Sequence, residues 1–212
     1  MGIAEIFDEF LMRRLWKEVR KRHKEGLHQV SARFDELLKE ELKASAPPEA
    51  VKNYSFGFSA GRAVGRRRPH PHIWWETRLG FTLDAIVGEA SIPIACIGFE
   101  ITPARMSTQS VAIVQVQGVV GKKEELKHVR WERLLYRTVV THAQALGVAE
   151  VVSFPARKNH YYFSYLKEAS SAIEERRSRM RLIYDKTPLK CGFVWDEKRQ
   201  LFVRSFPSES KK

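Results

Sequence analysis

The segment between residues 110 and 156 constrains the fold more than any other, because it has the pattern of a β-α-β unit. Residues 110–120 are rich in β-branched side chains, which favour a half-buried strand, and residues 148–156 form a second apolar stretch of strand length. Between them, apolar side chains recur at three- and four-residue steps and share one helical face: Trp131, Leu134, Leu135, Val139, Ala143 and Leu146. Because a helical crossover joins parallel strands, we predict parallel strands side by side near 111–119 and 148–154.

The predicted sheet extends on both sides of this unit. Residues 81–87 alternate apolar and polar side chains, whereas residues 91–102 are almost continuously apolar, as a central strand is. Short connections join these two strands to the one at residue 110, which predicts an antiparallel meander. Gly118 stands where a β-bulge would splay the sheet, and a closing hairpin follows Gly192.

The predicted fold class is therefore α/β, or α+β, with a mixed sheet of about six or seven strands. The crossover helix should run from about Val129 to Leu146, with Gly147 as its left-handed C-cap.

We expect a single domain over residues 1–212. Residues 1–48 have the apolar spacing of a helical pair, which Pro47 and Pro48 end. Residues 49–75 are rich in glycine, proline and arginine, which predicts a basic loop. Residues 76–212 then form the mixed sheet with its crossover helix.

The net charge of +12 is distributed unevenly. Residues 51–75 hold basic side chains and no acid, and a second basic block includes Arg176, Arg177, Arg179 and Arg181. Such blocks favour anionic partners such as nucleic acid, a phosphate-bearing cofactor or an acidic protein. The alternative is a solvated basic surface without a ligand.

Cysteine usage and hydropathy bear on the compartment. The two cysteines are far apart in sequence and lack metal-site spacing, which favours a reduced, cytoplasmic protein. No apolar run approaches membrane-spanning length.

The basic loop combines cations with flat rings. Arg66, Arg67 and Arg68 are followed by His70, His72, Trp74 and Trp75, a composition suited to pairing with phosphates and stacking on bases of a nucleic acid. The other interpretation is that the tryptophans anchor the loop to the core. The two histidines have no further ligand nearby, so no metal site is predicted.

The order of these elements resembles the GNAT superfamily of acyl-CoA-dependent N-acetyltransferases. The residues that carry the resemblance are the strand at 110–120, the helix with Leu134 and Leu135, Asn159 beyond the next strand, and Tyr184 ahead of Gly192. The resemblance covers roughly the C-terminal half of the chain. It implies a GNAT-like fold, an acetyl-CoA or other acyl-CoA donor, and an amine-bearing small molecule or protein as acceptor.

The resemblance also implies roles for individual residues. The backbone of Gln117, Gly118 and Val119 would hold the acyl carbonyl, and Asn159 would contact the cofactor. Tyr184 would be the general acid, because a phenol near its ordinary pKa is protonated at neutral pH. A core aromatic residue is the alternative at that position.

Three further residues are candidates for the site. Glu100 lies late in an apolar strand, where burial would raise its pKa toward the range of a general base; a Glu at the edge of a strand end is the alternative.

The resemblance places a glycine-rich phosphate loop before the crossover helix, but no glycine lies between Lys122 and Leu146. Side-chain cations must then replace the backbone donors, and Lys127 and Arg130 stand at the helix start.

Three hypotheses follow. The first is an N-acyltransferase that moves an acyl group from acyl-CoA to an amine. The second is a nucleic-acid-binding protein that keeps the fold without catalysis, with Arg66, Arg67 and Arg68 in the contact. The third is a scaffold without either activity.

Overall fold

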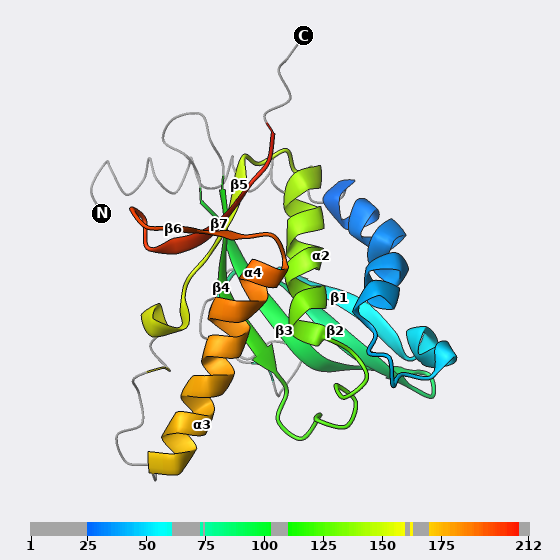
Figure 1. Ribbon diagram of the computed structural model, residues 1–212. Coiled ribbons are helices and arrows are strands. Elements are labelled where there is room, and N and C mark those ends of the chain that lie inside the picture. Colours follow the sequence, from blue (N-terminus) through cyan, green and yellow to red (C-terminus); the bar gives the residue numbers. More distant parts are fainter. Residues whose placement is uncertain are drawn as a thin grey trace, which may run out of the picture.

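The computed structural model describes residues 25–60, 73, 75–102, 110–159, 162 and 170–207 (Figure 1). These residues form an α+β fold around a seven-stranded mixed sheet. The strands are β1 (Tyr54–Ala60), β2 (Leu79–Val87), β3 (Ala90–Thr102), β4 (Ser110–Gly118), β5 (Glu150–Ser153), β6 (Val194–Asp196) and β7 (Leu201–Ser205). Their order across the sheet is β1-β2-β3-β4-β5-β7-β6.

The β-α-β unit is confirmed. β4 and β5 pair in parallel from Ser110 opposite Glu150 to Ile113 opposite Ser153. The crossover helix α2 (Trp131–Ala145) buries the predicted apolar face against the sheet. Gly147 follows it with φ +66°, a left-handed conformation that ends the helix.

The predicted antiparallel meander of β2, β3 and β4 is also confirmed. The prediction of a loop over residues 49–75 is wrong in part. A 3-10 turn, η1 (Pro48–Asn53), leads into β1, which pairs with β2. The aromatic side chains of β1 alternate with small ones, a period of two that suits a strand with one face on the core. The arginines and His70, His72 and Trp74 of the predicted loop lie outside the described residues.

One face of the sheet carries the main core. A helix over residues 25–41, the described part of the predicted helical pair, lies beside α2 on this face (Figure 1). Its Phe34 ring packs 5.0 Å from that of Phe56 on β1. A bridge between Leu42 and Val129 joins the end of this helix to the start of α2.

A smaller buried cluster lies on the other face of the sheet. Ile73 and Trp75 are fully buried there with Cys96 and Val119. Gly80 makes this contact possible, because a Cβ at that position would lie 1.9 Å from the Trp75 ring. Trp75 therefore anchors the chain to the core, as one of the two interpretations predicted.

The predicted bulge at Gly118 is wrong. Gly118 pairs regularly with Ala95 at the end of β4. The register shifts instead between Gly98 and Phe99 of β3, which face Gln115 and Ile113. The position of a bulge depends on both strands, so β4 alone could not specify it.

The C-terminal part begins with three consecutive helical segments. They are α3 (Ser170–Arg181), a π-helical turn η4 (Leu182–Lys186) and α4 (Thr187–Lys190). The predicted hairpin after Gly192 is confirmed as β6 and β7, and β7 pairs antiparallel with β5. Within the described ranges, none of the helices is both long and apolar enough to cross a membrane.

Candidate functional site

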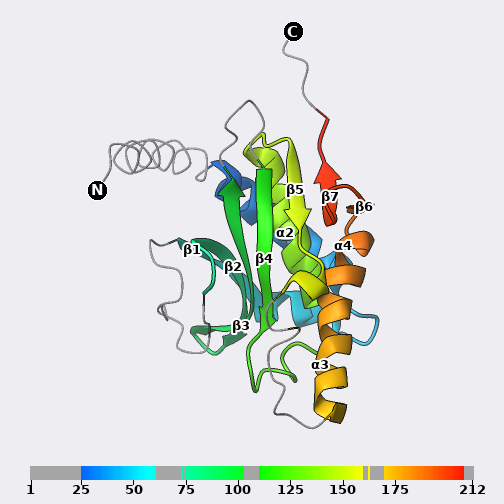
Figure 2. The same cartoon turned by 90° about the vertical axis from the view of Figure 1, so that its left-hand side faces the viewer.

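The candidate site lies where β4 and β5 separate. Their pairing ends at Ile113 and Ser153. β5 then gives way to Pro155 and the short turn η2 (Ala156–Lys158), whereas β4 continues to Gly118 (Figure 2). Beyond Ile113, one edge of β4 thus has no strand partner among the described residues.

A side chain fills this opening in place of a strand. The Tyr184 hydroxyl accepts the N–H of Val116 at 2.9 Å and donates to the C=O of the same residue at 3.2 Å. Tyr184 comes from the π-helical turn η4 and is 5% exposed. Its phenol therefore satisfies two backbone groups that a neighbouring strand would otherwise bind.

Burial raises the pKa of Tyr184 above its ordinary value of 10, and the charges of Glu76 and Cys96 raise it further. Hydrogen bonds from the Val116 backbone and the Asn159 side chain act in the opposite direction. The phenol is thus protonated at neutral pH, as a general acid must be.

Asn159 completes this arrangement from a third element. It ends η2, with its N–H on the Ala156 carbonyl at 3.0 Å, and its side chain hydrogen-bonds the Tyr184 hydroxyl. The structure therefore brings together Tyr184, Asn159 and β4, which are far apart in sequence.

Of the three residues named by the resemblance, only Gly118 turns its backbone groups toward the opening, and Val116 does so as well. The N–H and C=O of Val116 face Tyr184. By strand alternation, the N–H and C=O of Gly118 lie on the same edge of β4. The Val119 N–H donates to Ile94 at 2.8 Å and so faces β3. The side-chain oxygen of Gln117 accepts a hydrogen bond from the Gln115 side chain at 3.0 Å. Val116 is a residue that the sequence did not single out.

Glu76 is a second residue that the sequence did not single out. Its N–H donates to Gln115 at 3.0 Å. The charge of its carboxylate raises the pKa values of Tyr184 and Cys96, and the pKa of Cys96 reaches about 12, chiefly through burial. No local pattern marks Glu76, because the folded chain before β2 carries it to the site.

Glu100 lies elsewhere on the sheet. It pairs with Ala112, and its Oε1 accepts the Arg78 N–H at 2.6 Å. Val116 is four residue steps along β4 from Ala112, roughly 13 Å at 3.3 Å per residue. The structure therefore does not bring Glu100 to Tyr184.

Lys127 and Arg130 lie at the start of α2 as predicted, and both have contacts. Lys127 pairs with Glu124 at 2.8 Å on the exposed surface. Arg130 donates its N–H to Glu41 and a guanidinium N–H to Leu42, at 2.8 and 3.0 Å. Both acceptors are carbonyl oxygens at the end of the helix over residues 25–41.

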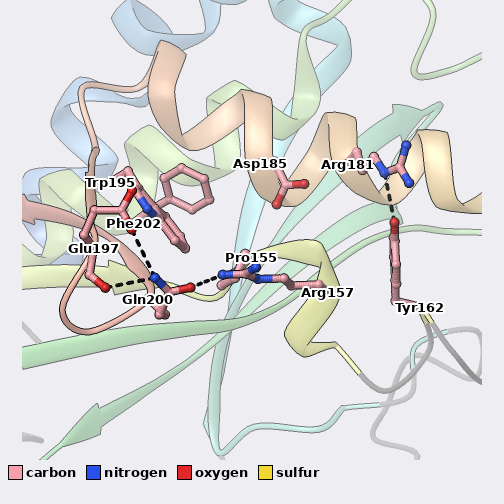
Figure 3. A pocket seen from close by; sticks show the side chains of 9 residues that line it. All are labelled: Pro155, Arg157, Tyr162, Arg181, Asp185, Trp195, Glu197, Gln200 and Phe202. Carbon is pink, nitrogen blue, oxygen red and sulfur yellow. Dashed lines mark hydrogen bonds between the residues drawn. The ribbon is translucent and has the colours of Figure 1, made fainter.

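A cavity of about 620 Å³ lies on the C-terminal side, where η2, η4 and the β6–β7 hairpin meet (Figure 3). Its lining residues are Pro155, Arg157, Tyr162, Arg181, Asp185, Trp195, Glu197, Gln200 and Phe202. Asp185 directly follows Tyr184 in the chain, and its Oδ1 accepts the Ala156 N–H at 2.8 Å.

Searches for similar proteins gave no assignment: no family model matches this chain, and no curated protein shows significant similarity to it. In the part of the chain that the structure covers, no group of three or more His, Cys, Asp or Glu residues could hold a metal ion.

Proposed function

We propose that this protein is an acyl-CoA-dependent N-acyltransferase whose acyl donor binds in the opening between β4 and β5. The observation that carries the proposal is the pair of hydrogen bonds between the Tyr184 hydroxyl and the Val116 backbone. This backbone edge binds a small polar group in place of a strand. The resemblance to the GNAT superfamily rests on the same elements.

The donor fits the opening through its amides and its thioester carbonyl. An acyl-pantetheine chain can pair with a strand edge as a peptide does. The Val116 N–H would bind the thioester oxygen and stabilise negative charge that develops on it. Gly118 offers the next backbone groups along the same edge. Tyr184 must first release the Val116 N–H.

After this exchange, Tyr184 can act as the acid. Acyl-CoA supplies a thioester carbon that the amine nitrogen attacks, the C–N bond forms, and the C–S bond breaks. Tyr184 gives its proton to the departing sulfur. The amine must lose a proton in return. The carboxylate of Glu76 can accept it, because the Glu76 backbone is bonded to the side chain of Gln115, the neighbour of Val116, and the Glu76 charge acts on Tyr184. We therefore assign this role to Glu76 rather than to Glu100.

The diphosphate of the donor requires cations, and two remain suited to it. The Lys127–Glu124 pair is mostly exposed, with side chains 54% and 79% accessible. Exposed pairs contribute about 0–1 kcal/mol, so a phosphate can replace Glu124 at little cost. Arg130 uses one guanidinium N–H on Leu42, and a guanidinium has five such donors.

Calorimetric titration with acetyl-CoA tests the proposal. We expect wild-type protein to bind and Lys127→Ala to bind about tenfold more weakly, as the loss of a charge-assisted contact implies. Lys39→Ala, which removes the same charge from an exposed position on the helix over residues 25–41, is the control. We expect its affinity to equal that of the wild type.

Tyr184→Phe is a second test, because it should strengthen acetyl-CoA binding and slow the reaction. Without the hydroxyl, the Val116 N–H has no competitor for the thioester oxygen, so acetyl-CoA should bind more tightly. The release of CoA thiol in the presence of a primary amine should become slower, because the acid is missing. Absence of acetyl-CoA binding at millimolar concentration by both the wild type and Tyr184→Phe would overturn the proposal.

A further inference from the structure

The cavity beside the β6–β7 hairpin presents layered flat surfaces. The Arg157 guanidinium lies over the Trp195 ring at 5.7 Å, and the Phe202 ring packs against Trp195 at 5.0 Å. At the other end, the Arg181 guanidinium lies 5.8 Å from the Tyr162 ring. Aromatic rings and guanidinium planes are the surfaces on which unpaired bases stack.

Side chains around the cavity hold the arginines in place. Arg157 donates to the Gln200 side chain, and Gln200 in turn donates to Glu197 at 3.2 Å. Arg181 donates its Nε–H to the Tyr162 hydroxyl at 2.9 Å. Within the described chain, the two terminal nitrogens of Arg181 have no hydrogen-bond partner. An ordered guanidinium with spare N–H groups suits a phosphate, which it can bind through two oxygens.

The charges of the lining residues nevertheless argue against a simple anion as the ligand of the cavity. Arg157 and Arg181 are offset by the carboxylates of Asp185 and Glu197, so the lining carries as many acids as arginines. Glu197 is engaged within its own turn by Gln200.

Asp185 lies between the two aromatic ends of the cavity (Figure 3). Its Oδ1 is fixed by the Ala156 N–H, and this leaves Oδ2 as an acceptor. A ligand must therefore supply hydrogen-bond donors as well as a flat ring and a negative charge.

We propose that this cavity binds a nucleotide whose base carries an exocyclic amino group. The base stacks on the Trp195 and Arg157 layer, its amino group donates to Asp185, and its phosphate meets Arg181. The nucleotide can be free or an unpaired residue of a strand, since both present the same groups. This proposal does not depend on acyl transfer, and its test uses no acyl donor.

Cytidine and uridine monophosphate form the matched pair of probes, because their bases differ mainly in an amino donor against a carbonyl acceptor. In calorimetric titrations at low salt, we expect cytidine monophosphate to bind about tenfold more tightly than uridine monophosphate. Asp185→Asn should reverse this preference. Its amide oxygen can keep the Ala156 N–H, so that its NH₂ faces the ligand.

Three charge variants separate the cavity from the general basic surface. Arg157→Gln and Arg181→Gln should each weaken binding about tenfold. Arg179→Gln removes the same charge from the same helix as Arg181, but Arg179 does not line the cavity. We expect its affinity to stay within about twofold of the wild type, since only a screened long-range term is lost. All three arginines are exposed, so folding should be preserved.

A labelled oligocytidylate of about eight residues identifies the source of the nucleotide. If cytidine monophosphate displaces it at similar concentrations of nucleotide, the cavity takes a free nucleotide. If only the oligomer binds, with the same sensitivity to Arg181→Gln, the cavity takes a residue of a strand. The proposal is overturned if neither probe binds, if Arg179→Gln is as harmful as Arg181→Gln, or if the wild type does not distinguish the two bases.

Discussion

At the scale of single residues, the Tyr184 hydroxyl has one observed role and one proposed role. It occupies the Val116 backbone in the structure and is also the acid of the proposed reaction. The resemblance named this tyrosine but not its contact with β4. That contact is set by the π-helical turn, which no pattern in residues 182–186 predicts.

The stability of Tyr184→Phe should reveal the structural role. Removal of the hydroxyl leaves a buried N–H and C=O without a partner, which costs about 1–3 kcal/mol. We expect the free energy of unfolding in urea, followed by circular dichroism, to fall by this amount. Tyr162→Phe, whose hydroxyl contact with Arg181 is exposed, should change it by less than about 0.5 kcal/mol. Equal losses in the two variants would contradict a special contact at Val116.

At the scale of elements, a buried carboxylate attaches the helix over residues 25–41 to α2. Glu41 is fully buried and forms ion pairs with Arg133 at 3.1 Å and Arg137 at 2.9 Å. The backbone of Arg130 joins the same contact through the Glu41 carbonyl. The start of α2, where the donor phosphates are proposed to bind, is therefore positioned by the helix that precedes the sheet.

Glu41→Gln should test this attachment. Loss of the charge removes the counterion of Arg133, whereas Arg137 keeps its ion pair with Glu40. The two arginine side chains are 32% and 26% exposed, so water offsets part of the cost. We expect a loss of roughly 2 kcal/mol in the free energy of unfolding. The control is Glu36→Gln on the same helix, whose pair with Arg33 is exposed at 3.6 Å and should be worth less than about 0.5 kcal/mol. A loss for Glu41→Gln no larger than that of the control would contradict the attachment.

At the scale of the whole molecule, two free and buried thiols make stability depend on alkaline pH. Burial raises the pKa of Cys96 and that of Cys191 to about 12, against an ordinary value of 9. The folded protein therefore retains these protons when the unfolded chain has lost them. This contribution to stability is complete below pH 9 and is lost as the pH rises toward 12.

Urea unfolding between pH 8 and 10.5 measures this effect. Above pH 9 each thiol should contribute a decrease of up to about 1.4 kcal/mol per pH unit. Cys96→Ala and Cys191→Ala should each make the decrease less steep, while Ser91→Ala, an exposed substitution on β3, should not. An unchanged slope in both cysteine variants would contradict the assignment.

The sequence predicted those features that depend on local periodicity. The spacing of Trp131, Leu135 and Val139 specified α2, and the strands around it followed from their β-branched residues. Features that depend on how distant elements pair could not be predicted from these local patterns. The resemblance named Gln117 and Val119 but not Val116, because the register of β4 with β3 decides which backbone groups face the opening. The engagement of Arg130 depends on a helix about ninety positions earlier in the chain.

The π-helical turn η4 has a consequence for how the chain can change over time. A π turn holds one residue more than the α-helical turn it replaces, and each residue rotates a helix by about 100°. Deletion of one residue between Leu182 and Lys186 would restore an uninterrupted helix, but it would rotate Tyr184 relative to α4. Homologous lineages that bind a ligand at Val116 should therefore retain the length of this turn even where its composition drifts.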